Sequence, residues 1–283
     1  MLAGPYSGFR IEIKEPAIAL LTFDEPARLN GMHVDTKRDF VEAITQIQCS
    51  DEVRVLVVTG EGRAFCAGDD VRGGYWGDDD SWQKARSQRV RKERKDGLGS
   101  YSTLRAFSAA VNRALLDLDK LSIAAINGHA IQSGLSLALA CDFRIASTAA
   151  KLGSATLRMG YMPDEGGHHL LVQHIGVAKT LDFLMNSRIV DAGEALALGL
   201  VHETVEPERL LERALELAAQ LSDGPQVAMR LLKRAVYNAA DLTFVQACDD
   251  IAGKTGISDH HPDTREGVAA FLDKRKPRFN SKT

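Results

Sequence analysis

Residues 126–146 read INGHAIQSGLSLALACDFRIA, and this stretch decides the fold. It begins at the end of an apolar run, residues 122–130, which contains the turn signal Asn127-Gly128. A buried helix is expected over 133–142 and a strand over 143–147. Apolar runs of this kind are typical of parallel strands that are buried on both faces. The stretch therefore predicts a strand, a buried helix and a second strand beside the first.

The segments before it follow the same pattern. Residues 9–23 alternate as two short strands around Pro16, and residues 35–48 carry apolar side chains at helical spacing. The run VRVLVVTG, residues 53–60, is a buried strand ending in glycine, and helical spacing returns over 101–119. Repeated helix and strand units predict an α/β fold with parallel pairing.

Two regions depart from this pattern. Strand signals stop near residue 206, and residues 209–221 and 226–237 form amphipathic helices, so the expected division is an α/β core over 1–205 and a helical region over 206–283. Residues 72–100 carry an acidic cluster, a basic cluster and several glycines. We expect an exposed, variable insertion there, partly helical over 81–95.

Bulk composition excludes several classes of protein. The 283 residues carry a formal net charge of -3, which gives no overall basic field for nucleic acid. The cysteines, Cys49, Cys66, Cys141 and Cys248, lack metal-ligand spacing, so no metal is expected. The N-terminal segment is broken by charges and no apolar run reaches membrane-spanning length. The expectation is a soluble, cytoplasmic protein with no membrane partner.

Five segments in order resemble the crotonase (enoyl-CoA hydratase/isomerase) superfamily: LTFDEPARLNGM (21–32), GRAFCAGDDV (62–71), INGHAIQSGLSLALACDFRIA (126–146), LRMGYMPDEGG (157–167) and REGVAAFLDKRKPRF (265–279). The resemblance implies a spiral of ββα turns with a C-terminal helical oligomerisation region. It also implies a homotrimer or a dimer of trimers acting on an acyl-CoA thioester. Coenzyme A would enter as part of the substrate, with no permanently bound cofactor.

The resemblance also implies an oxyanion hole, in which two backbone N–H groups stabilise the negative charge on a thioester oxygen. The donors would be the amides of Asp69, after Ala67-Gly68, and of Ser133, at the start of a helix whose positive end adds to the effect. Gln132 and Ser133 stand where two of three glycines are usual in the family. The amide survives that change, but Ser133 must reach the same geometry with a Cβ atom present.

Both glutamates of the family's hydratases are replaced, by Ser136 and by Thr156. Neither hydroxyl is a general base near neutral pH, although both could still orient a water. Asp164, directly after Pro163, matches the aspartate of dienoyl-CoA isomerases and of isomerases of ring-derived CoA esters. One carboxylate suffices to move a proton between two carbons, so Asp164 is the candidate base for a double-bond shift.

Other roles compete for these residues. Asp164 would merely cap a helix beginning at 165. Glu165 is a second possible acid, or it lies in the first turn of that helix with solvent or the helix dipole as its partner. His168 or His169 would face and tune the acid, or be exposed. His129, in the turn leading to Ser133, would line the pocket or be structural.

Coenzyme A contacts follow from the resemblance alone. They involve Asn30 to Met32, the turn at Ala67, and the rim residues Arg28 and Arg63, while Lys274 and Phe279 would reach a neighbouring subunit's nucleotide site. Plain surface or packing roles are the alternative for each. The basic cluster KARSQRVRKERK, residues 84–95, is read as a solvated helix face, a phosphate-facing lid or an RNA contact, and it lacks the aromatics of base stacking.

These observations favour isomerase-type proton transfer by Asp164 in an acyl-CoA enzyme. Three alternatives stay open: a hydratase with an altered water site, a hydrolase or ring-cleaving relative, and a non-catalytic binder of acyl-CoA or RNA. The acyl group and the pathway are not encoded in any motif of the chain.

Overall fold

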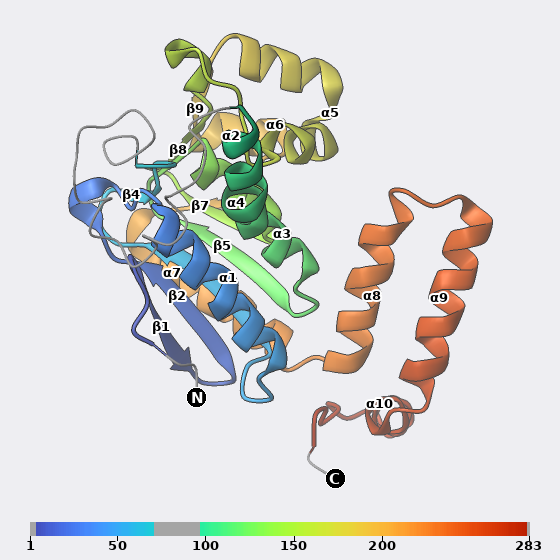
Figure 1. Ribbon diagram of the computed structural model, residues 1–283. Coiled ribbons are helices and arrows are strands. Elements are labelled where there is room, and N and C mark those ends of the chain that lie inside the picture. The colour runs from blue at the N-terminus through green and yellow to red at the C-terminus, as the bar shows by residue number, and fades with distance from the viewer. Residues whose placement is uncertain (1–3, 71–96, 282–283) are drawn as a thin grey trace.

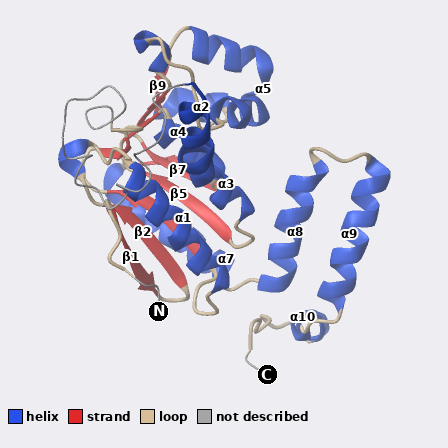
Figure 2. Cartoon of the chain, in the orientation of Figure 1, coloured by secondary structure: helices blue, strands red, loops and turns tan. Residues whose placement is uncertain are grey.

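The computed structural model describes residues 4–70 and 97–281, which form two sheets and the helices around them (Figure 1). The larger sheet has six strands in the order β1 (Phe9–Lys14), β2 (Ile18–Phe23), β3 (Val55–Gly60), β5 (Leu121–Ile126), β7 (Phe143–Ser147) and β10 (Glu203–Val205). Its neighbouring strands are parallel except for the antiparallel pair β1 and β2. Figure 2 shows strands β1, β2, β5 and β7 of this sheet in red, with blue helices around them. The predicted α/β class is confirmed.

A smaller, four-stranded sheet has the order β4 (Ala64–Cys66), β6 (His129–Ile131), β8 (Lys151–Gly153) and β9 (Ile189–Asp191). The single strand expected over 122–130 is therefore wrong, because β5 and β6 belong to different sheets. The chain crosses between them at Asn127-Gly128. A Cβ atom on Gly128 would lie 2.1 Å from the Arg63 carbonyl oxygen, so only glycine allows this close approach.

Both faces of the larger sheet are buried, and alternate residues of each strand enter separate clusters. On one face, Leu21 and Leu56 belong to the cluster that includes α1 (Val34–Cys49), α3 (Ala109–Asp117) and α4 (Ser133–Ala140). On the other, Leu20 and Val57 belong to a cluster with residues of α7 (Leu210–Ser222). This two-sided burial explains the near-continuous apolar strands of the sequence.

The last strand ends at Val205, as expected, but the helical region does not separate from the core there. Leu210, Ala214 and Ala218 of α7 pack on the sheet, so α7 belongs to the core. The helices that stand apart are α8 (Gln226–Ala239), α9 (Phe244–Asp259) and α10 (Pro262–Leu272), as Figure 1 shows. Polar contacts anchor α8 to the core, including Lys233 Nζ to Asp142 Oδ2 at 2.7 Å.

The remaining elements connect these layers. They are α2 (Gly97–Thr103), the π-helical turn η4 (Leu104–Ser108), α5 (Gly167–Met185), α6 (Ala192–Leu198) and the 3-10 turns η1 (Pro26–Arg28), η5 (Thr156–Met159) and η6 (Pro207–Arg209). Of the predicted insertion, residues 72–96, with the basic cluster 84–95, lie outside the described residues, and 97–100 begin α2.

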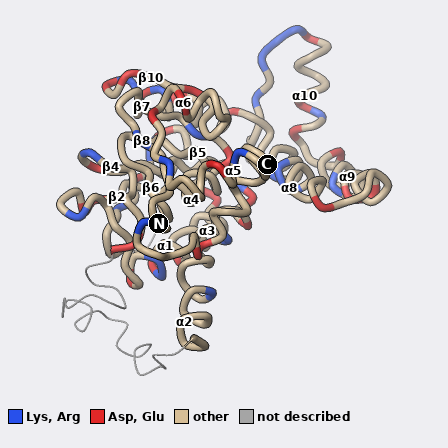
Figure 3. Tube along the Cα trace, turned by 90° about the horizontal axis from the view of Figure 1, so that it is seen from above, with Lys and Arg blue, Asp and Glu red and all other residues tan. Residues whose placement is uncertain are grey.

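Charges of both signs are interspersed over the described residues (Figure 3). Within this part of the chain, no helix has both the length and the apolar character needed to cross a membrane.

Candidate active site

Two turns meet beside the smaller sheet, one after β4 and one after β6, which are parallel neighbours. Gly68 has a φ of +98°, in the region that favours glycine. A Cβ atom placed on it would lie 3.2 Å from the Ile131 carbonyl oxygen and 3.7 Å from the Ser133 nitrogen. The backbone of the first turn therefore packs directly against the start of α4.

Side chains also join the two turns. The Ser133 hydroxyl donates to Asp69 Oδ1 at 2.9 Å, and Lys37 Nζ donates to Asp69 Oδ2 at 2.5 Å. Lys37 is buried in α1 and donates in addition to the Ser108 hydroxyl at 2.9 Å. A charged, hydrogen-bonded clamp thus holds Asp69 against Ser133.

The backbone around Asp69 is fixed by its neighbours. The Met32 amide donates to the Gly68 carbonyl at 2.9 Å, and the Asp70 amide donates to the Met32 carbonyl at 3.1 Å. Within residues 4–70 and 97–281, neither the Asp69 amide nor the Ser133 amide donates to another protein group. Both N–H groups are therefore available to an external acceptor.

Gln132 occupies the position before Ser133 with φ 51° and ψ -110°, a conformation rarely adopted by a residue with a Cβ atom. Its side chain compensates with hydrogen bonds in both directions. Nε2 donates to Glu165 Oε1 at 3.0 Å, while Oε1 accepts from Ser154 Oγ at 2.6 Å and from Thr156 Oγ1 at 3.1 Å. Gln132 therefore links the second turn to Glu165 and to the segment that follows β8.

Glu165 is the buried acid of the site, with only 2% of its surface exposed. Its Oε1 accepts from the Ser136 hydroxyl at 2.6 Å, and its Oε2 accepts from the Asp164 amide at 2.9 Å. The Asn112 side chain also donates to the Glu165 carbonyl at 2.9 Å. The expectation that Glu165 lies in the first turn of a helix is wrong, because α5 begins at Gly167. Protein atoms, rather than solvent, surround this carboxylate.

Asp164 is the exposed acid beside it. The pKa of Asp164 is raised to about 7. Partial burial is the largest cause, followed by a hydrogen bond with Glu165 and by the negative charges of Glu165 and Asp69. The positive charge of Lys37 acts in the opposite direction. The alternative that Asp164 caps α5 is wrong, because Gly166 is the N-cap and no side chain bonds there. Asp164 is thus an accessible carboxyl that titrates near neutral pH.

Ser136 and Thr156, the two residues at the hydratase glutamate positions, both belong to this site. Each hydroxyl donates within the protein, to Glu165 and to Gln132 respectively. His168, by contrast, is exposed on α5, which is one of the two positions expected for it from the sequence. His129 opens β6 opposite Ala64 and Lys151, at the far end of that strand from Gln132.

The residues expected to contact coenzyme A divide into rim and support. Arg28 is partly exposed and bonds to the buried Asp70 at 3.0 Å, and Arg63 is exposed. Asn30 is buried, and its Nδ2 donates to the carbonyls of Glu61 and Ala64 at 3.0 and 2.7 Å. Its side chain therefore braces the turn that leads into β4.

Ala67 also supports this region, because its amide donates to the Leu29 carbonyl at 3.0 Å. The bond ties the turn before Asp69 to the segment that follows η1.

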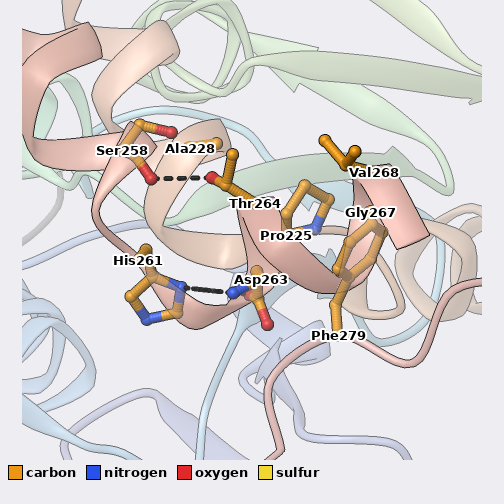
Figure 4. A pocket seen from close by; sticks show the side chains of 9 residues that line it. All are labelled: Pro225, Ala228, Ser258, His261, Asp263, Thr264, Gly267, Val268 and Phe279. Carbon is orange, nitrogen blue, oxygen red and sulfur yellow. Dashed lines mark hydrogen bonds and ion pairs between the residues drawn. The ribbon is translucent and has the colours of Figure 1, made fainter. Parts of the chain in front are cut away.

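Lys274 and Phe279 are not brought to this site within the chain. Phe279 lies across α10, in a cavity of about 280 Å³ (Figure 4). Its ring contacts Gly267, where a Cβ atom would be 3.4 Å from it. The cavity is lined by Pro225, Ala228, Ser258, His261, Asp263, Thr264, Gly267, Val268 and Phe279.

Sequence reasoning missed Lys37, Asn112 and Ser154. Lys37 is in phase with the buried Phe40, Ile44 and Ile47 of α1, so a lysine at a core position was the available signal. Asn112 likewise lies between buried residues of α3. Ser154 had no comparable signal. Among the described residues, no cluster of histidine, cysteine or carboxylate side chains could hold a metal ion.

A mixed α/β core with a separate helical hairpin, together with two converging backbone turns, defines the class of fold. The family model for enoyl-CoA hydratase/isomerase matches residues 13–282. The chain therefore belongs to the enoyl-CoA hydratase/isomerase family, within the crotonase superfamily, and is an acyl-CoA enzyme.

Individual relatives agree with this assignment. The chain is 31% identical over 270 residues to crotonyl-CoA hydratase of Syntrophomonas wolfei, covering 95% of this chain and 96% of the relative. It is also 31% identical over 273 residues to 1,2-epoxyphenylacetyl-CoA isomerase of Escherichia coli, covering 95% and 97%. The crystal structure of enoyl-CoA hydratase from Bacillus anthracis superposes with a TM-score of 0.84 at 28% identity, covering 98% of this chain and 100% of that one. The relatives include both a hydratase and an isomerase.

Proposed function

We propose that this protein isomerises an acyl-CoA thioester by moving a proton from one carbon to another through Asp164. The amides of Asp69 and Ser133 would hold the thioester oxygen while the enolate forms. The observation that carries the proposal is the accessible Asp164 carboxyl, whose pKa is raised to about 7. A group that titrates near the working pH can both accept and return a proton.

The surroundings of Asp164 support the oxyanion part of the proposal. The charges of Asp69 and Lys37 both act on Asp164, so the carboxyl lies near the two turns. Neither turn amide is used by another described group of the protein. Donors fixed before the reaction stabilise developing charge most effectively, because they need no reorganisation.

Isomerisation is favoured over two-glutamate hydration. Ser136 and Thr156 are committed to Glu165 and Gln132 by hydrogen bonds, at 2.6 and 3.1 Å. Neither can take a proton from water near neutral pH. Asp164 combines accessibility with a pKa that is raised to about 7.

The test is a reaction with a 3-enoyl-CoA and with a dienoyl-CoA, followed by ultraviolet absorbance and mass spectrometry. The expected product has the same mass as the substrate and a shifted double bond. A product heavier by one water would instead identify hydration, and release of free thiol would identify a hydrolase. Acyl-CoA binding without turnover of any thioester would identify a non-catalytic binder.

Hydration with an altered water site is the second candidate. It is favoured by one observation: Asp164 and Glu165 are adjacent carboxyl groups, and Glu165 bonds directly to Ser136, the residue at a hydratase glutamate position. Two carboxyls of different environment can divide acid and base roles. A separate reaction with a 2-enoyl-CoA tests this candidate, and a product heavier by one water would support it against the first.

We further propose that α8–α10 form contacts between copies of the chain in a trimer or a dimer of trimers. Large apolar side chains are exposed along these helices, including Leu232, Val236, Phe244, Phe271 and Leu272. Lys274 and Phe279 would then reach a neighbouring subunit's coenzyme A. Light scattering after size-exclusion chromatography gives the mass, and a monomer would contradict this arrangement.

A further inference from the structure

Three of the four departures from the family's usual pattern belong to one hydrogen-bonded network. Gln132 and Ser136 donate to Glu165 Oε1 at 3.0 and 2.6 Å, and Thr156 donates to Gln132 at 3.1 Å. Gln132 forms these bonds from a backbone conformation that a glycine would adopt more easily. Such strain persists only where the surrounding structure compensates for it. Gln132 and Ser136 therefore share one partner, the buried Glu165 carboxylate, and Thr156 is linked to it through Gln132.

The network fixes Glu165 against Asp164. The Asp164 amide donates to Glu165 Oε2 at 2.9 Å, and the two carboxyl groups are themselves within hydrogen-bonding reach. A Cβ atom on Gly167 would lie 2.0 Å from the Ser136 hydroxyl and 3.1 Å from Glu165 Oε1, so the start of α5 packs directly against Ser136 and Glu165. Glu165 is buried while Asp164 is accessible, so only Asp164 is positioned to meet a substrate.

We propose that Glu165 is a positioning residue: its buried carboxylate, held by Gln132 and Ser136, lies against Asp164 and opposes the ionisation of Asp164, so that Asp164 can both accept and return a proton. The inference rests on the proposed function for the reaction itself. The proton that Asp164 takes from one substrate carbon stays on Asp164 until Asp164 returns it to the other carbon. No oxidant or further reactant is needed.

The charged groups that act on Asp164 come from several elements. Glu165, from the same loop, and Asp69, from the turn after β4, both oppose its ionisation, while Lys37 of α1 favours it. Glu165 contributes more than Asp69, through a hydrogen bond as well as its charge. Removing the Glu165 charge must therefore make Asp164 ionise at lower pH.

The test follows the Asp164 carboxyl by infrared difference spectroscopy during a pH titration of the full-length protein, without substrate. Subtracting the Asp164→Asn spectrum isolates the band. The wild-type midpoint is expected at about 7, and Glu165→Gln should lower it. The expected decrease is about one pH unit or more. Glu208→Gln, at an exposed carboxylate on η6, is the matched control and should leave the midpoint unchanged.

If the Asp164 midpoint is the same in Glu165→Gln as in wild type, the inference is wrong. If this variant folds poorly, Glu165→Ala serves instead, because its smaller side chain leaves room for water beside Gln132 and Ser136, and the same decrease is expected. Turnover of a 3-enoyl-CoA gives the second readout: the rate of Glu165→Gln should persist to lower pH than that of wild type, with KM little changed. Since the infrared titration needs no reaction, its failure is distinct from failure of the proposed isomerisation.

Discussion

The two turns that hold the candidate donors each contain a residue at positive φ, and they accommodate it by different means. Gly68 has φ +98° and no side chain, because a Cβ atom there would press on the Ile131 carbonyl at 3.2 Å. Gln132 has φ 51° and keeps a side chain, which bonds to Glu165, Ser154 and Thr156. The first turn is constrained by space, whereas the second is constrained by hydrogen bonds. A strained position can therefore be retained for what its side chain holds in place.

The largest effect is expected for Asp164, which lies at the end of the hydrogen-bond network that starts at the second turn. Asp164→Asn removes the proposed base while keeping its size, so turnover of a 3-enoyl-CoA should fall by about 10²–10⁴-fold. Wild-type rates should also fall as the pH decreases through about 7, because the carboxyl must be ionised to accept a proton. Steady-state kinetics measure both effects, with the exposed Asp51→Asn as the control. Unchanged turnover in Asp164→Asn would exclude the single-base reaction.

The next largest effect is expected at the turn that lacks a side chain. Gly68→Ala adds a Cβ atom against backbone at a positive φ, so the Asp69 amide should shift and kcat should fall by about 10²-fold. Thermal unfolding should show a loss of about 1–3 kcal/mol from strain. Gly253→Ala is the matched control, because a Cβ atom there meets nothing within 4 Å. Wild-type kinetics in Gly68→Ala would show that the first turn is not constrained by space.

Gln132→Gly should have a smaller effect, with opposing parts. The substitution relieves the positive φ but removes the bonds to Glu165, Ser154 and Thr156. Each lost hydrogen bond costs about 1 kcal/mol, partly offset by the relief of strain. We expect a modest loss of stability and a decrease in kcat of about tenfold as Glu165 loses a donor. A variant that is both more stable and fully active would show that the Gln132 side chain has no function.

The smallest effect is expected for Ser133→Ala. The amide donor is kept, and only the hydroxyl bond to Asp69 at 2.9 Å is lost. Lys37 still holds Asp69, so stability should fall by about 0.5–1.5 kcal/mol and kcat by only a few-fold. Chemical denaturation and steady-state kinetics measure the two changes. A loss as large as that of Gly68→Ala would mean that the clamp, rather than the backbone, sets the donor geometry.

The fold was largely predictable from the sequence, since two-sided burial leaves a clear record in strands such as Val55–Gly60. The division of residues 122–130 between two sheets could not be predicted, because Asn127-Gly128 signals a turn but does not show that the chain changes sheets there. Likewise, the end of the strand pattern near residue 205 does not mark the end of the core, because the next helix, α7, packs on the sheet.

The candidate site was predictable only in part. The turns at Asp69 and Ser133 and the acid Asp164 follow from motif resemblance. The burial of Glu165 does not, because its partners Gln132 and Ser136 are about thirty residues away along the chain, with separations of 33 and 29. Long-range hydrogen bonds leave no periodic signal in a single sequence.

The most direct test of the account is a crystal structure with an unreactive acyl-CoA analogue bound. The thioester oxygen should lie about 2.7–3.1 Å from the backbone nitrogens of both Asp69 and Ser133. The acyl carbons next to that thioester should face the Asp164 carboxyl. An analogue whose oxygen contacts neither amide, or whose acyl chain points away from Asp164, would contradict the proposed chemistry.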